Sequence, residues 1–149
     1  VELVALISSV IRDAEFEFQQ TGKSVAFSSE DSVTIYGNAD LIASMLENII
    51  RNGMRYTQDN SALKVDLLQK EGSVMISVAD SGPGVDPADL ARIFEAFYRA
   101  DKSREASGGH HGIGLTLAKT IAQTHSGNIS ASNIPGGGLE IRIELPISS

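Results

Sequence analysis

The 149-residue sequence contains no cysteine, few basic residues and no long apolar run. Without cysteine, disulfide bonds and cysteine-ligated zinc are excluded, and a reducing compartment fits the composition. No apolar run approaches membrane-spanning length and no signal peptide is visible, so we expect no direct membrane contact from this segment. Lys and Arg number 12 against 19 Asp and Glu, and the resulting net charge of -7 argues against a nucleic-acid partner.

The hydrophobic content predicts a folded domain. Hydrophobic residues make up 42% of the chain, which is enough for a core at this length. We therefore expect residues 1–149 to form a single domain. The chain begins at Val1 without an initiator Met, which suggests a fragment of a longer protein.

Apolar residues at three- and four-residue spacing predict three main helices. The first ends near Gly22, the second begins at the cap residue Asn38, and the third opens at Gly112. Pro87 predicts the start of a short helix that runs to an aromatic end at Phe97.

Alternating or β-prone residues predict strands, and we expect the first two at a sheet edge. The strand after residue 70 forms a hairpin with the one before it and stops at Asp80. Together the elements predict an open sheet covered by helices on one side. The expected strands are residues 25–27, 33–36, 63–67, 74–79, 128–134 and 139–145.

The stretch that follows the fourth expected strand has the composition of a ligand site. Asp80 stands at a strand end beside Gly82 and Gly84, where the backbone can approach a ligand closely. A carboxylate there could accept a hydrogen bond from an exocyclic amino group. Taken alone, the motif is more often a plain turn. A polar helix upstream and a glycine-rich helix start downstream favour the ligand site.

The upstream helix carries a line of polar residues beside its apolar stripe. Asn48 and Asn52 are four residues apart and so lie one above the other, with Arg55 and Tyr56 continuing the line. Two amides in this position are either ordinary surface residues or a magnesium site with Asn52 as the ligand. Gly53 costs about 1 kcal/mol inside a helix, so it is either a helix defect or a place where a flat ring packs.

The downstream segment pairs a long loop with a glycine-rich helix start. Residues 98–111 show no apolar period and are expected to form a mobile loop. Residues 112–115, Gly-Ile-Gly-Leu, then open a helix, where unpaired N–H groups and the positive dipole end can bind phosphate.

Taken in order, these motifs resemble the ATP-binding domain of bacterial sensor histidine kinases. Their residues look most similar to those of kinases of the CpxA kind. Each motif is weak singly, but their joint order is specific and covers nearly the whole chain. The N box resembles residues 48–57, the G1 box residues 80–84, the F box residues 94–97, the G2 box residues 112–115, and the last glycine run residues 136–138.

The resemblance implies the ATP-binding fold shared with gyrase, Hsp90 and MutL. This fold is a two-layer α/β sandwich with a mixed, mostly antiparallel sheet of about five strands. Three main helices would cover one face, and residues 98–111 would form a flexible ATP lid.

The resemblance also implies a role for individual residues. Asp80 would bind the adenine amino group, and Asn52 would bind Mg²⁺ with support from Asn48. The phosphates would face Arg55 and the lid arginines. The implied ATP-binding set is Asn48, Asn52, Arg55, Tyr56, Asp80, Gly82, Gly84, Val85, Phe97, Arg99, Arg104, Gly112, Ile113, Gly114 and Leu115.

The implied reaction is transfer of the ATP γ-phosphoryl group to a histidine on a separate dimerisation domain of the same kinase. That acceptor histidine lies outside this chain, so no catalytic residue is expected within it. A response regulator would be reached through the full-length protein. The expected location is the cytoplasmic side of an inner-membrane sensor kinase.

Two alternatives remain open, a nucleotide-sensing pseudokinase module and an ATPase of the gyrase or MutL type. ATPases of this fold resemble one another in having a Glu where this chain has Asn48, and an amide cannot act as a general base. Glu47 is next to it but about 100° around the helix. We therefore predict that the site holds ATP rather than hydrolysing it.

The sequence departs from the family pattern at several positions. His110 replaces a lid-hinge glycine or marks an insertion, Gly53 replaces a usual Ala, and Leu139 replaces a common Thr. His110 and the adjacent His111 are expected to be solvated lid residues rather than metal ligands. His125 is expected to favour the dipole at the end of its helix.

Overall fold

The computed structural model describes residues 1–29, 32–95 and 111–148, with the backbone alone for residues 111–114. Two short 3-10 helices, η1 (Gln19–Thr21) and η2 (Pro87–Arg92), accompany the regular elements. The regular elements are α1 (Leu3–Glu17), β1 (Ser24–Ser28), α2 (Ala39–Tyr56), β2 (Ala62–Lys70), β3 (Ser73–Ala79), α3 (His111–Thr124), β4 (Asn128–Asn133) and β5 (Leu139–Pro146).

The strands form one five-stranded sheet in the order β1-β2-β3-β5-β4. β1 and β2 are parallel because the chain crosses back through α2 between them, and the other pairs are antiparallel. The register places Val65 of β2 beside Val78 of β3, and Val78 beside Ile141 of β5. The predicted mixed, mostly antiparallel sheet is confirmed.

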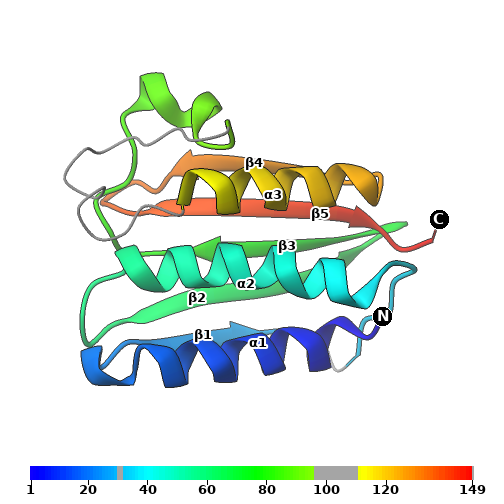
Figure 1. Ribbon diagram of the computed structural model, residues 1–149, viewed down its shortest axis with the longest axis horizontal. Helices are drawn as coiled ribbons and strands as arrows, with labels where there is room; N and C mark the ends of the chain where they lie inside the picture. The colour runs from blue at the N-terminus through cyan, green and yellow to red at the C-terminus, as the bar shows by residue number, and fades with distance from the viewer. Residues whose placement is uncertain (30–31, 96–110, 149) are drawn as a thin grey trace.

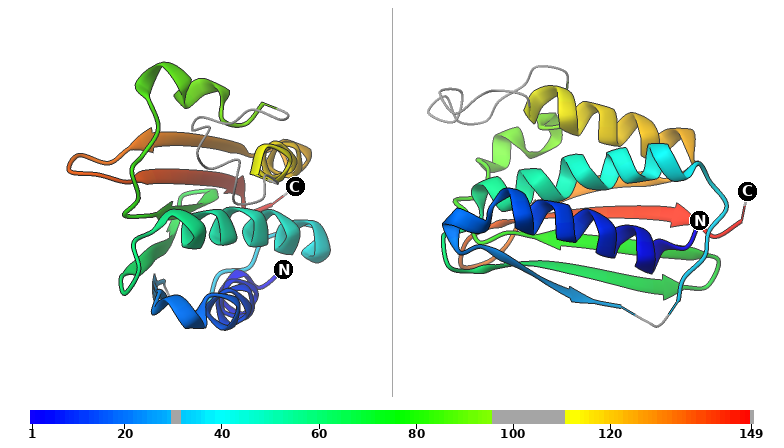
Figure 2. Two further views of the ribbon diagram at one scale, coloured as in Figure 1. Left: turned by 60° about the vertical axis from the view of Figure 1, so that its left-hand side comes forward. Right: turned by 60° about the horizontal axis from the view of Figure 1, so that its bottom comes forward.

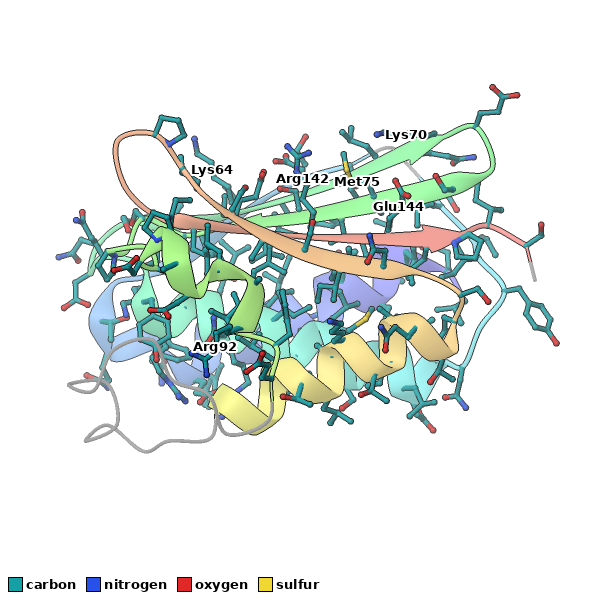
Figure 3. The ribbon with its side chains drawn as sticks, turned by 90° about the horizontal axis from the view of Figure 1, so that it is seen from above. Lys64, Lys70, Met75, Arg92, Arg142 and Glu144 are labelled. Carbon is teal, nitrogen blue, oxygen red and sulfur yellow. The ribbon has the colours of Figure 1, made fainter. Side chains whose placement is uncertain are left out.

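The molecule has two layers, since α1, α2 and α3 all lie on the same face of the sheet (Figures 1 and 2). Alternation along each strand turns the apolar side chains toward the helices and the polar ones toward solvent. Figure 3 shows Lys64, Lys70, Met75, Arg142 and Glu144 projecting from the face without helices. The predicted two-layer α/β sandwich is therefore confirmed.

Helix α2 is the central helix of the covering layer (Figure 1). Its N-cap Asn38 accepts a hydrogen bond at Oδ1 from the Leu41 N–H at 3.0 Å, as the sequence predicted. The predicted stripe is fully buried; its members are Ile42, Met45, Leu46 and Ile49. Across the described ranges, no helix has the length and apolarity that crossing a bilayer would demand.

Gly53 of α2 serves the contact between helix and sheet. A β-carbon there would come within 2.7 Å of Leu63 Cδ1 and 3.4 Å of Val78 Cγ1. The absence of a side chain at Gly53 therefore allows α2 to pack closely against β2 and β3. Neither a helix defect nor packing of a flat ring is needed to explain it.

Two predictions about local structure were wrong. Residues 33–36 are no strand of the main sheet; they pair with the N-terminus instead, through a bridge between Glu2 and Thr34 and mutual backbone hydrogen bonds between Val1 and Ile35. The helix expected from Pro87 is a 3-10 turn that ends at Arg92. No residue of the turn is buried, whereas Ile93 and Phe94, which were expected within the helix, are buried directly after it.

Candidate nucleotide-binding site

Four chain segments converge at one end of the sheet, opposite the two termini (Figure 1). They are the last turn of α2, the loop after β3, the first turn of α3 and the hairpin between β4 and β5. Each segment carries one of the predicted motifs. The fold thus brings together residues that are far apart in the sequence.

The carboxylate of Asp80 is fixed at this end of the sheet by backbone groups. Asp80 is 7% exposed, and its Oδ1 accepts hydrogen bonds from the Gly82 N–H at 2.8 Å and the Leu139 N–H at 3.1 Å. Its own N–H donates to the Leu139 carbonyl at 3.0 Å. The register of β3 on β5 therefore sets both the position and the orientation of this acid.

Two glycines permit the close packing around Asp80. A β-carbon on Gly82 would overlap the Tyr56 carbonyl oxygen, and one on Gly138 would overlap the Asp80 carbonyl oxygen. Gly138 also has a φ of +109°, which disfavours any other residue. Gly138, the last residue of the glycine run, is thus needed to bring β5 against the Asp80 loop.

Asn133 holds the far end of the Asp80 loop, a role that the sequence did not reveal. Its Oδ1 accepts from the Val85 N–H at 2.9 Å, and its Nδ2 donates to the Val85 carbonyl at 2.5 Å. The side chain therefore pairs with Val85 as a neighbouring strand would. Gly84 leaves room for it, because a β-carbon there would lie 2.7 Å from Asn133 Oδ1.

Hydroxyl groups of the N box and the G1 box join the end of α2 to the Asp80 loop, a role that the sequence did not reveal. Thr57 Oγ1 and Ser81 Oγ lie 2.9 Å apart, and Thr57 Oγ1 accepts from the Ser81 N–H at 3.0 Å. Ser81 Oγ in turn accepts from the Gln58 N–H at 3.1 Å. The helix end and the loop are thereby held as one unit.

The amides of α2 lie on the turns that lead to this unit. Asn52 is only 9% exposed, yet no described residue forms a hydrogen bond with its side chain. Asn48, Arg55 and Tyr56 are half-buried, whereas Glu47 is exposed on another side of the helix, as its position predicted. A nearly buried amide of this kind suits a polar ligand or a hydrated cation.

The first turn of α3 borders the site from the other side. Residues 112–114 lie in this turn and Leu115 behind them is buried, so the predicted helix start is confirmed. Thr116 Oγ1 donates to the Phe94 carbonyl at 2.8 Å, which ties the helix to the segment after η2. Phe97, Arg99, Arg104, His110 and the rest of residues 98–110 lie outside the described residues, and His111, expected as the last residue of the lid loop, is the first residue of α3.

His125 lies directly after α3, at the end of its helix as the sequence placed it. Its Nδ1 lies 2.9 Å from the Ile121 carbonyl oxygen, and its Nε2 accepts from the Asn38 N–H at 3.1 Å. His125 therefore joins the C-terminus of α3 to the N-terminus of α2 by hydrogen bonds.

A carboxylate at the end of a central strand, a helix with a nearly buried amide and a second helix N-terminus thus lie at the same end of the sheet. The family of histidine kinase-, DNA gyrase B- and HSP90-like ATPases matches residues 37–149. The chain belongs to this family, as its motifs predicted. ATP is the ligand that this family implies.

Its curated relatives are sensor histidine kinases. The chain is 34% identical over 147 residues to the signal transduction histidine-protein kinase BaeS of Escherichia coli K12. This match covers 99% of this chain and 32% of BaeS. The chain is 38% identical over 143 residues to the sensor histidine kinase CpxA of the same organism, with coverage of 95% and 31%. The chain thus spans about a third of the length of these relatives.

A solved structure supports the same grouping. Full-length ShkA, crystallised in complex with AMPPNP, superposes with a TM-score of 0.85 at 26% identity, covering 100% of this chain and 31% of that one. The fold expected from the motifs is therefore confirmed for the residues that the structure describes.

Proposed function

We propose that this chain is the ATP-binding catalytic domain of a sensor histidine kinase. In this proposal it binds Mg-ATP and presents the γ-phosphoryl group to a histidine on a separate dimerisation domain of the same protein. The observation that carries the proposal is that the C-terminal part of α2, the loop after β3 and the start of α3 lie at one end of the sheet, since these segments carry Asn52, Asp80 and the glycine-rich turn. The AMPPNP complex of ShkA lends support from a similar domain.

Asp80 would select the base. A carboxylate accepts hydrogen bonds but donates none, so it matches the exocyclic amino group of adenine and rejects a carbonyl at the same place. Its two backbone hydrogen bonds preorganise the acid before the nucleotide arrives. Gly82, Gly84 and Val85 would line the base pocket on the same loop.

The residues at the other side of the site would hold the phosphates and the ion. The amide of Asn52 fits a magnesium ligand because its oxygen is a hard donor that no described residue engages. Mg²⁺, when bound, would neutralise charge on the phosphates. The N–H groups of Gly112, Ile113 and Gly114 and the side chain of Arg55 would add to this.

The reaction would be an in-line displacement, in which an imidazole nitrogen of the acceptor histidine attacks the γ-phosphorus. The bond from phosphorus to the bridging oxygen breaks and ADP leaves, so catalysis depends chiefly on positioning and charge. Asn48, an amide, cannot activate water as a base. This chemistry favours transfer to histidine over hydrolysis.

The acceptor domain, the response regulator and the membrane anchor belong to the full-length protein in this proposal. The chain itself would work on the cytoplasmic side, where ATP is available. Its motif order and its relatives support this placement.

Autophosphorylation tests the proposal directly. The chain is joined to its native upstream sequence and incubated with ATP labelled at the γ-phosphate, and histidine-bound label is measured. We expect label in the parent protein and in an Asn128→Ala control at the exposed start of β4, and none in Asn52→Ala. ATP binding without label would indicate a sensing module, and appreciable release of free phosphate would indicate an ATPase.

A further inference from the structure

Lys23 is a nearly buried lysine that neither the motifs nor the family match includes. It lies between η1 and β1, outside residues 37–149, and its side chain is only 7% exposed. A lysine is rarely buried to this extent without a specific partner. Its partners lie in the last turn of α2, which is the turn that carries the candidate ATP-binding residues Arg55 and Tyr56.

The ammonium group of Lys23 caps the C-terminus of α2. Its Nζ donates to the Met54 carbonyl at 2.8 Å and to the Arg55 carbonyl at 3.2 Å. A positive charge at this position also interacts favourably with the negative end of the helix dipole. The Phe18 ring lies beneath the ammonium at 5.6 Å from its centroid, and Asp59 stands 3.8 Å away.

The Lys23 cap takes the place of a backbone hydrogen bond that is not formed at the end of α2. In a continuing helix the Gln58 N–H would donate to the Met54 carbonyl. Here the Gln58 N–H donates to Ser81 Oγ, next to Asp80. The Gln58 N–H, just beyond the helix, thus binds Ser81, and the Met54 carbonyl receives its hydrogen bond from Lys23. Both backbone groups are therefore satisfied where the helix ends at the Asp80 loop.

We propose that Lys23 is a positioning residue for nucleotide binding. Its ammonium keeps the last turn of α2 in its helical conformation by binding the Met54 and Arg55 carbonyls. This fixes Arg55 and Tyr56 relative to Asp80. Without Lys23 the last turn is unwound in part of the molecules, and only the molecules with a helical turn bind ATP. The apparent affinity therefore falls by the same factor as the helical fraction. This inference rests on the proposed function, because it assigns Lys23 to the same ATP site.

The test compares Lys23→Met with two controls. Methionine keeps the length of the side chain but removes its donors. Lys70→Met removes the same charge from an exposed position at the end of β2, and Asp59→Asn removes the ion pair but keeps the cap. Mg-ATP affinity is measured by calorimetry, and amide hydrogen exchange is followed along α2.

We expect Lys23→Met to bind Mg-ATP about tenfold more weakly and to exchange faster at residues 54–58 than elsewhere in α2. Both controls should match the parent chain. The affinity loss should persist at high salt, where the Debye length falls to about 3 Å and a through-space effect of the lost charge on the phosphates is screened. A loss that vanishes at high salt would overturn the positioning role.

A second variant guards against misfolding. If Lys23→Met does not fold, Lys23→Arg keeps the charge while changing the donor geometry, and we expect a smaller affinity loss with faster exchange at residues 54–58. Unchanged affinity despite faster exchange would overturn the inference. If the parent chain itself binds no ATP, the proposed function fails, and the role of Lys23 in ATP binding fails with it. If the parent binds and Lys23→Met binds equally well, only the Lys23 inference fails.

Discussion

Replacing Asp80 by Asn and by Ala separates the two roles that this acid has in our account. In the structural role, Oδ1 accepts the N–H groups of Gly82 and Leu139. In the binding role, the carboxylate accepts a hydrogen bond from the amino group of adenine. Asparagine keeps an oxygen for the first role but puts an NH₂ group where the second needs an acceptor.

The expected magnitudes follow from these hydrogen bonds. Asp80→Ala leaves two N–H groups without an acceptor at a buried position, which costs about 1–3 kcal/mol each. Asp80→Asn should lose less than about 1 kcal/mol, because Oδ1 still accepts. A hydrogen bond to a charged group contributes about 1.5–3 kcal/mol, so ATP affinity should fall about 10- to 150-fold in Asp80→Asn.

Urea unfolding and calorimetric titration with Mg-ATP measure the two effects separately. Inosine triphosphate adds a positive test, since its carbonyl replaces the amino group of adenine. Asp80→Asn should shift the preference from ATP toward inosine triphosphate. The reasoning is refuted if Asp80→Asn binds ATP like the parent chain, or if it is destabilised as much as Asp80→Ala.

Three further predictions concern stability. Asn133→Ala leaves the Val85 N–H and carbonyl without partners and should lower the free energy of unfolding by about 1–3 kcal/mol; an unchanged urea-unfolding midpoint would contradict this. Gly138→Ala forces a β-carbon against the Asp80 carbonyl at positive φ and should cost about 1–3 kcal/mol in the same assay, whereas an unchanged midpoint would refute the packing argument. The pKa of Glu2 is lowered chiefly by the Val4 N–H, with the Val33 and Ala5 N–H groups adding to it, so its contribution to stability is present above the pKa of the unfolded chain and is lost as pH falls through the folded value. Glu2→Gln should therefore lose less stability than the parent on acidification, and parallel pH profiles would argue against the cap.

The layers of this fold could be predicted because they depend on local periodicity. The stripe of Ile42, Met45, Leu46 and Ile49 recurs at helical spacing, and all four residues are fully buried. The alternation along β5 likewise marked its buried face. Residues 33–36 have the β propensity of a strand, but they pair with Val1 and Glu2 at the start of the chain and not with the main sheet. Propensity does not indicate which segment a β-prone stretch pairs with.

The positioning residues could not be predicted because their roles arise from contacts between distant segments. Lys23 lies 31 residues before the Met54 carbonyl that it caps, and Asn133 lies 48 residues after Val85. Neither has a local pattern that distinguishes it from a surface lysine or a strand-end asparagine. The position of Asp80 at the end of β3 could be predicted from the glycines that follow the strand, whereas its backbone hydrogen bonds could not.

A crystal structure of this chain with a non-hydrolysable ATP analogue and Mg²⁺ tests the central claim most directly. The account predicts the adenine amino group about 3 Å from the Asp80 carboxylate, the ion at the Asn52 amide and the phosphates at the first turn of α3. A base bound away from Asp80, with the phosphates away from α3, would contradict it.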